Sequence, residues 1–154
     1  MKETIPLDEA NPELLKNEIR KSGNVDSYKK LTMYYVDKKM DPDFLEISIL
    51  MYEKYKCIDA LSIIYDAVIY KYNPEIPFYT GDKTALLSKV PINQKLIALH
   101  YLKIGLKIGD YSCIENLSEY YLSIGDYEKS RQLMKKIDSI VNIRRKYIKD
   151  SLNE

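Results

Sequence analysis

A nine-residue helical pattern occurs three times in this chain and is the feature that most limits its fold. The copies are 27–35, 57–65 and 113–121, and they begin 30 and then 56 residues apart. In each copy the fifth residue is leucine, the sixth is a small hydroxyl residue and the ninth is tyrosine. On a helix the leucine and the tyrosine share one face, and the small residue lets a neighbouring backbone approach. The pattern therefore predicts three helices that pack in the same way.

Glycine, proline and helix-capping residues separate the helical segments. Asn11-Pro12 and Asp41-Pro42 each place a capping oxygen before a proline at the first helical position. Gly23, Gly109 and Gly125 each follow an apolar-periodic segment and precede Asn or Asp, as expected where one helix ends and the next begins. No segment alternates apolar and polar residues as a strand does. The predicted helices are 12–22, 25–38, 42–55, 57–72, 93–108, 111–124 and 126–149.

One long irregular segment, residues 73–91, lies between the fourth and fifth predicted helices and lengthens the second repeat interval. It contains Gly81 and three of the six prolines, and a short helix is predicted over 82–89. Loops longer than about 12–15 residues are uncommon in compact domains and are often functional. We therefore predict a single helical-repeat domain over residues 1–154, with residues 73–91 as a loop insertion between the helices of the middle repeat.

The segment 111–137 resembles a tetratricopeptide repeat or its close relative, the Sel1-like repeat. The residues that carry the resemblance are Leu117, Tyr121, Gly125-Asp126-Tyr127-Glu128-Lys129, Ser130 in the family's alanine position and Met134 in its aromatic position. The resemblance is strongest over 94–138, partial over 12–72 and absent from the insertion. It implies an all-α fold, a short right-handed α-solenoid of about three helix-turn-helix repeats with capping helices.

The resemblance also implies a function, the binding of a peptide or protein in a groove lined by the first helix of each repeat. The family's groove positions correspond here to Lys29, Met33, Val36, Asp59, Ile63, Asp66, Glu115, Asn116, Glu119 and Leu122. These side chains are mixed in charge, which predicts weak electrostatic steering and short-range contacts. We predict a non-catalytic protein-interaction module, an adaptor or scaffold.

Two other functions remain open. In the first, a small regulatory or effector-neutralising protein binds its partner through the insertion, and the candidate contacts are Tyr70, Tyr72, Phe78 and Tyr79. The chain has 15 tyrosines, and tyrosine is enriched at interfaces, although an A/T-rich coding sequence also favours it. In the second, the chain is a structural repeat protein that self-associates as a homodimer, because an uncapped stack exposes an apolar end.

Charge and motifs argue against several other classes. The 24 basic and 23 acidic side chains give a net charge of +1, so nucleic acid is not an expected partner. No HExxH, GxSxG, GxGxxG or calcium-loop pattern occurs, so we predict no enzyme, no cofactor and no metal. Cys57 and Cys113 occupy the same small position of the repeat as Ser27, so we expect them to be buried at helix crossings.

The apolar runs of the sequence are too short to span a membrane. The N-terminal residues Met1 to Asp8 contain no apolar stretch of the kind a secretory signal needs, and no run approaches the roughly 20 residues that span a bilayer. The sequence therefore predicts a cytoplasmic protein without a membrane partner.

Overall fold

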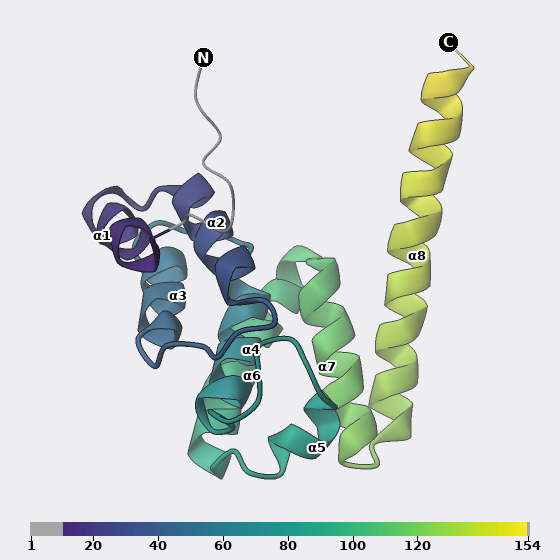
Figure 1. Cartoon of the computed structure of the whole chain (residues 1–154). Helices are drawn as coiled ribbons and strands as arrows, with labels where there is room; N and C mark the ends of the chain where they lie inside the picture. Colours follow the sequence, from purple (N-terminus) through teal and green to yellow (C-terminus); the bar gives the residue numbers. More distant parts are fainter. Residues whose placement is uncertain (1–10, 154) are drawn as a thin grey trace.

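The computed structural model describes residues 11–153, which form eight α-helices (Figure 1). The helices are α1 (Pro12–Ser22), α2 (Val25–Tyr35), α3 (Phe44–Glu53), α4 (Ala60–Lys71), α5 (Lys83–Leu87), α6 (Ile92–Ile108), α7 (Tyr111–Ser123) and α8 (Tyr127–Leu152). Within the described residues there is no strand, only an isolated parallel β-bridge between Val36 and Phe78. The prediction of an all-α fold is confirmed. The segment Met1 to Asp8 lies outside the described residues.

Local chemistry sets most of the helix ends at the predicted places. The side chain of Asn11 accepts hydrogen bonds from the Glu13 and Leu14 amides at the start of α1. Gly23 and Gly109 end α1 and α6 in the left-handed conformation, which costs glycine little.

The start of α3 differs from the prediction. Asp41-Pro42 was expected to begin this helix, but α3 begins at Phe44, and Asp43 makes no side-chain capping bond. The carboxylate of Asp41 instead accepts hydrogen bonds from Lys16 of α1 and Tyr35 of α2. A charged partner from another helix outweighs a local cap here, because hydrogen bonds to charged groups are the stronger ones.

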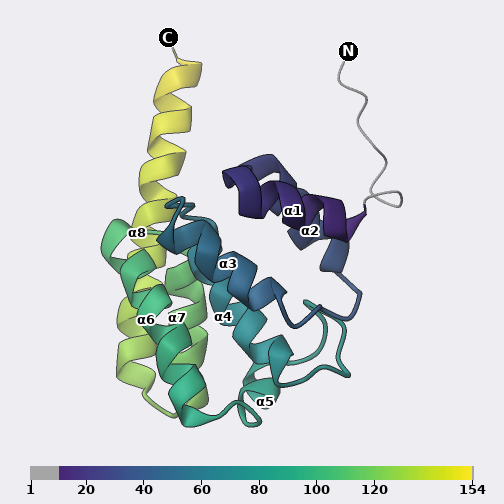
Figure 2. The same ribbon diagram turned by 90° about the vertical axis from the view of Figure 1, so that its left-hand side faces the viewer.

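From α3 to α8 the longer helices form a row. α3 contacts α4, α4 contacts α6, α6 contacts α7 and α7 contacts α8, while α1 packs against both α2 and α3 at the other end. The views in Figures 1 and 2 show α8 continuing well beyond its neighbour α7. No helix among residues 11–153 combines the length and the apolar character needed to cross a membrane.

The repeated pattern forms the centre of the core. Its three leucines, Leu31, Leu61 and Leu117, are fully buried. The tyrosines Tyr35 and Tyr65 are also buried, whereas Tyr121 is half-buried at the edge of the row. The leucine position is therefore a packing position in all three helices, as predicted.

The two cysteines are free and buried, as the pattern predicts. Cys113 of α7 packs directly against Gly105 of α6, and a methyl group at Gly105 would overlap the cysteine side chain. The absence of a side chain at Gly105 therefore permits the close approach of α6 and α7.

The insertion is part of the core. The predicted short helix is present as α5, with Asp82 as its cap. Phe78, Leu86 and Val90 are buried, and the Phe78 ring lies 5.7 Å from Phe44 and 5.0 Å from Tyr70 between ring centroids. Burial of such aromatic clusters contributes strongly to stability.

Candidate functional site

An open cleft lies between α2, the start of α4 and the start of α7. Its volume is about 350 Å³. Its lining residues are Tyr28, Lys29, Thr32, Met33, Asp59, Ser62, Ile63, Asp110 and Ser112. Four of the ten predicted groove residues, Lys29, Met33, Asp59 and Ile63, thus lie together around one cleft.

The cleft combines accessible apolar side chains with a lysine and an aspartate that are mostly exposed to solvent. Met33 is 56% exposed, and Ile63 is half-buried against the core. Lys29 and Asp59 face each other at 3.8 Å between Nζ and Oδ2, and both side chains are mostly solvated. Such a pair is weak, so a ligand can separate it at little cost. The cleft therefore offers apolar side chains together with one cation, Lys29, and two carboxylates, Asp59 and Asp110.

The other end of the predicted groove is occupied by the chain itself. Val36, Asp66 and Leu122 are equivalent, since each is the tenth residue counted from the start of its repeat copy. The segment 78–84, here called the strap, reaches all three positions. At the first, the Phe78 amide donates to the Lys38 carbonyl over 2.7 Å, and the Asp37 amide donates to the Phe78 carbonyl over 3.0 Å.

At the second position the strap makes a polar contact with Asp66, and on α7 it makes one with Asn116, which precedes the third position. Lys83 Nζ donates to Asp66 Oδ1 of α4 over 2.9 Å and to Asn116 Oδ1 of α7 over 3.1 Å. Beside them Glu119 and Leu122 line a second cleft, of about 390 Å³, together with strap residues 81–84. The strap therefore crosses from the end of α2 over α4 to α7.

Burial controls the chemistry of Asp66. Its side chain is only 6% exposed, and burial raises its pKa, while the neighbouring Lys83 ammonium opposes that rise. Burial, followed by the charge of Asp66, also raises the pKa of Tyr79. The ammonium of Lys83 stabilises the buried charge, so we assign this cluster to holding the strap in place.

Four predicted contact residues are corrected by the structure. Asp66 and Asn116 are buried beneath Lys83 and do not line an open groove. Tyr70 and Phe78 belong to the core, and the Tyr70 hydroxyl donates to the Thr80 carbonyl over 2.7 Å. The strap, which the helical pattern does not include, covers Asp66 and Asn116 and packs its own Phe78 against Tyr70 and Phe44.

The remaining predicted residues are accessible but are not gathered in one place. Glu115 is exposed and lines neither cleft, and Val36 is 38% exposed beside the strap. Tyr72 is half-buried, and Tyr79 is 38% exposed. Of the four candidate contacts in and beside the insertion, only these two partly accessible tyrosine rings remain available to a partner.

Sequence reasoning missed two groups of residues. Asp110 and Ser112 line the open cleft because the turn between α6 and α7 brings the start of α7 beside α4. Asp110 could be recognised only as a helix cap, which it is. No sequence pattern identified Lys83 as a site residue, because its partners lie 17 and 33 residues away in the sequence.

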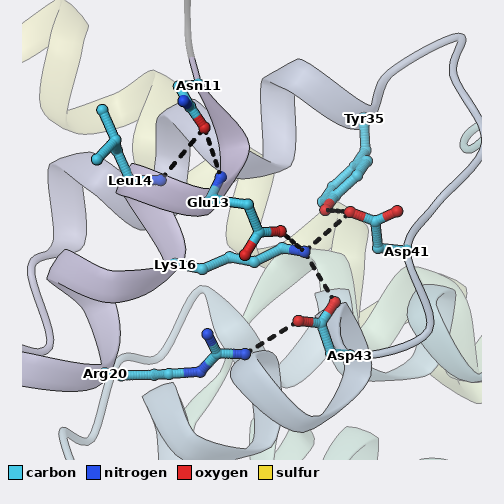
Figure 3. Close-up of polar contacts among 8 residues, drawn as sticks. All are labelled: Asn11, Glu13, Leu14, Lys16, Arg20, Tyr35, Asp41 and Asp43. Carbon is cyan, nitrogen blue, oxygen red and sulfur yellow. Dashed lines mark hydrogen bonds and ion pairs between the residues drawn. The ribbon is translucent and has the colours of Figure 1, made fainter.

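A buried lysine joins α1 to the segment that follows α2 (Figure 3). Lys16 is 2% exposed, and its Nζ lies 2.9 Å from Glu13, 2.8 Å from Asp41 and 3.0 Å from Asp43. Burial alone would lower the pKa of Lys16, but the hydrogen bonds to the three carboxylates outweigh it and raise the pKa. A lysine held protonated in this way does not act as a base. The cluster is a structural joint.

No metal site is evident in the part of the chain that the structure describes, since no three His, Cys, Asp or Glu side chains are grouped to hold an ion. Comparisons of the chain with known protein families, with curated proteins and with solved structures gave no match.

Proposed function

We propose that this chain is a non-catalytic protein-interaction module that binds a segment of a partner protein in the cleft between α2, α4 and α7. The observation that carries the proposal is the convergence of Lys29, Met33, Asp59 and Ile63 around that cleft. These residues come from two copies of the repeat and occupy the same two positions in each. A surface built from equivalent positions of adjacent helices is typical of a repeat stack that binds a peptide.

The chemistry of the cleft favours a peptide over a small molecule. The cleft is open and shallow, and its polar groups are solvated rather than aimed at one point, whereas small-molecule sites bury most of their ligand. Met33 supplies a flexible, polarizable surface that adapts to different side chains. Lys29 and Asp59 each offer a charge to a polar partner residue.

The strap sets the length of the proposed site. It lies beside the end of α2 and contacts the middle of α4 and of α7, so a bound segment contacts the middle of α2 and the first turns of α4 and α7. We propose a right-handed stack of about three repeats as the scaffold, and the order of packing from α3 to α8 supports it. The segment that fits is short, with one apolar anchor over Met33 and Ile63.

The experiment is a selection of peptides from a random library on the immobilised chain. Affinities of the selected peptides are then measured for the wild type and for Met33→Asp/Ile63→Asp. We expect at least about a tenfold loss, because burial of one such apolar side chain contributes roughly 1.5–3 kcal/mol. Leu96→Asp is the matched control, since Leu96 is an equally exposed apolar residue on α6 that lines none of these clefts.

One outcome would contradict binding in this cleft. If the selected peptides bind the folded double variant as tightly as they bind the wild type, the cleft is not their site. Met33 and Leu96 are exposed, whereas Ile63 is half-buried against the core, so circular dichroism is used to establish that both variants are folded before binding is compared.

A further inference from the structure

The last turns of α8 extend beyond the helix that packs against it, α7 (Figure 1). α8 has 26 residues and α7 only 13, and α7 covers α8 only over its first half. Leu133 and Ile137 are buried, Ile140 and Val141 are half-buried, and every described residue after Val141 is exposed. Figure 1 shows this part of α8 standing free of the other helices. We call residues 143–152 the α8 overhang.

The overhang is amphipathic. Its exposed apolar residues are Ile143, Tyr147, Ile148 and Leu152, which are 56–80% accessible. At 3.6 residues per turn they occupy one half of the helix circumference, which also holds Arg144 and Ser151, and they continue the stripe that carries Leu133 and Ile137 onto α7. A large apolar face of this kind on a soluble helix marks an interaction site.

The overhang is also strongly basic. It carries Arg144, Arg145, Lys146 and Lys149 against the single carboxylate of Asp150. Within residues 11–153 none of the four cations forms an ion pair, although other surface lysines do. The nearly neutral chain thus concentrates an excess of three positive charges on one free helical segment.

A cleft of about 440 Å³ at the base of the overhang extends this surface. Arg144 lines it together with Ile58, from the turn before α4, and Ile108, the last residue of α6. Both isoleucines are about half exposed, at 50% and 54%. A helix packed along the overhang would therefore find further apolar contacts at one of its ends.

We propose that the α8 overhang binds an acidic amphipathic helix of a partner protein, at a surface that adjoins the peptide cleft, since the cleft at its base shares Asp110 and Ser112 with that cleft. The apolar face supplies contact area, and the cations select carboxylates on the flanks of the partner. A second copy of this chain fits poorly, because two overhangs would bring like charges within the Debye length of about 8 Å at physiological salt. The charge excess therefore favours a partner of opposite charge.

The test uses two fluorescein-labelled synthetic helices with the same leucine face, one with a glutamate polar face and one with a lysine polar face. Fluorescence anisotropy measures their binding to the wild-type chain. We expect the glutamate peptide to bind and the lysine peptide to bind at least about tenfold more weakly, a difference of 1.4 kcal/mol. Binding of the glutamate peptide should weaken as salt is raised.

Two variants localise the binding. Tyr147→Asp/Ile148→Asp removes apolar contacts, and Arg145→Glu/Lys149→Glu reverses charge; each should weaken binding of the glutamate peptide at least about tenfold. The matched control is Lys135→Glu/Lys136→Glu, on exposed positions of the half of α8 that α7 covers, and it should bind nearly as the wild type does. All substituted residues are exposed, so thermal unfolding should change little.

Several results would overturn the proposal. These are equal binding of the two peptides, no binding of the glutamate peptide, or equal losses in the overhang and control variants. A wild-type dimer in analytical ultracentrifugation that Tyr147→Asp/Ile148→Asp dissociates would identify a second copy as the occupant instead. Binding to anionic phosphatidylglycerol vesicles without binding to the glutamate peptide would identify a membrane surface.

Discussion

Lys83 Nζ lies 2.9 Å from Asp66 Oδ1, and this contact fastens the strap to the middle of the helix row. Lys83→Met would leave a buried carboxylate without its cation. We expect a loss of about 3 kcal/mol in the free energy of unfolding at pH 7, since breaking a buried pair from one side is costly. Urea denaturation followed by circular dichroism measures the loss.

The stability loss in Lys83→Met should depend on pH. Burial raises the folded-state pKa of Asp66, so the folded chain binds this proton more tightly than the unfolded chain does. The loss of unfolding free energy in Lys83→Met should therefore be largest at neutral pH and shrink as pH falls toward the unfolded pKa of about 3.9. Lys89→Met, which removes an exposed ion pair with Glu75, is the control and should change stability little. A deficit independent of pH would contradict this account.

The pKa of Asp41 is shifted in the opposite direction from that of Asp66. Hydrogen bonds from Lys16 and then Tyr35 lower the pKa of Asp41, so its contribution is present above the unfolded pKa of about 3.9 and is lost as pH falls through the folded pKa. Asp41→Asn should cost about 1.5 kcal/mol at pH 7, the value of a hydrogen bond to a charged group. Unfolding free energies of the two proteins should converge below pH 4, and parallel profiles would refute the prediction.

Gly105→Ala tests the contact between α6 and α7. Alanine is favoured over glycine in a helix by about 1 kcal/mol, so a variant without steric conflict would be stabilised. The added methyl group would instead overlap Cys113, and overpacking typically costs about 1–3 kcal/mol. We expect a lower melting temperature, with partial recovery in Gly105→Ala/Cys113→Gly. A melting temperature above that of the wild type would show that the helices separate easily.

The cysteines should resist thiol reagents until the chain unfolds. Burial raises the pKa of both thiols, and both side chains are buried. Reaction with Ellman's reagent at pH 8 should be slow in buffer and should become fast across the urea transition. Cys57→Ser and Cys113→Ser assign each phase to one thiol, and glutathione gives the rate of an accessible thiol. Fast labelling of either cysteine in the native protein would contradict its burial.

Much of the fold follows from local sequence. Asn11, Gly23, Gly109 and Asp110 act within one helical turn, so their capping roles could be read directly from the sequence. The repeated leucine and tyrosine predicted which faces are buried, because the helical period fixes the side that each residue faces.

The sequence predicted the candidate site only in part. Lys29, Met33, Asp59 and Ile63 were found because equivalent repeat positions face the same cleft. Asp66 and Asn116 were misassigned, because what covers them is Lys83, which belongs to a segment outside the repeat pattern. Asp41 was read as a cap for the same reason, since the buried lysine that binds it comes from α1. Contacts between distant segments carry no periodic signal.

The strap also affects how this chain unfolds and which insertions or deletions of helices it can accommodate. In stacked-repeat proteins each unit touches only its neighbours, so units can fray separately or be duplicated. Here one segment is hydrogen-bonded beside α2 and to α4 and α7 at once. Fraying of any one of these helices breaks a contact that the other two share, which couples them into a single cooperative unit. A helix pair inserted or deleted between α2 and α7 would move these anchor points out of reach of the strap, so such a change should destabilise the chain.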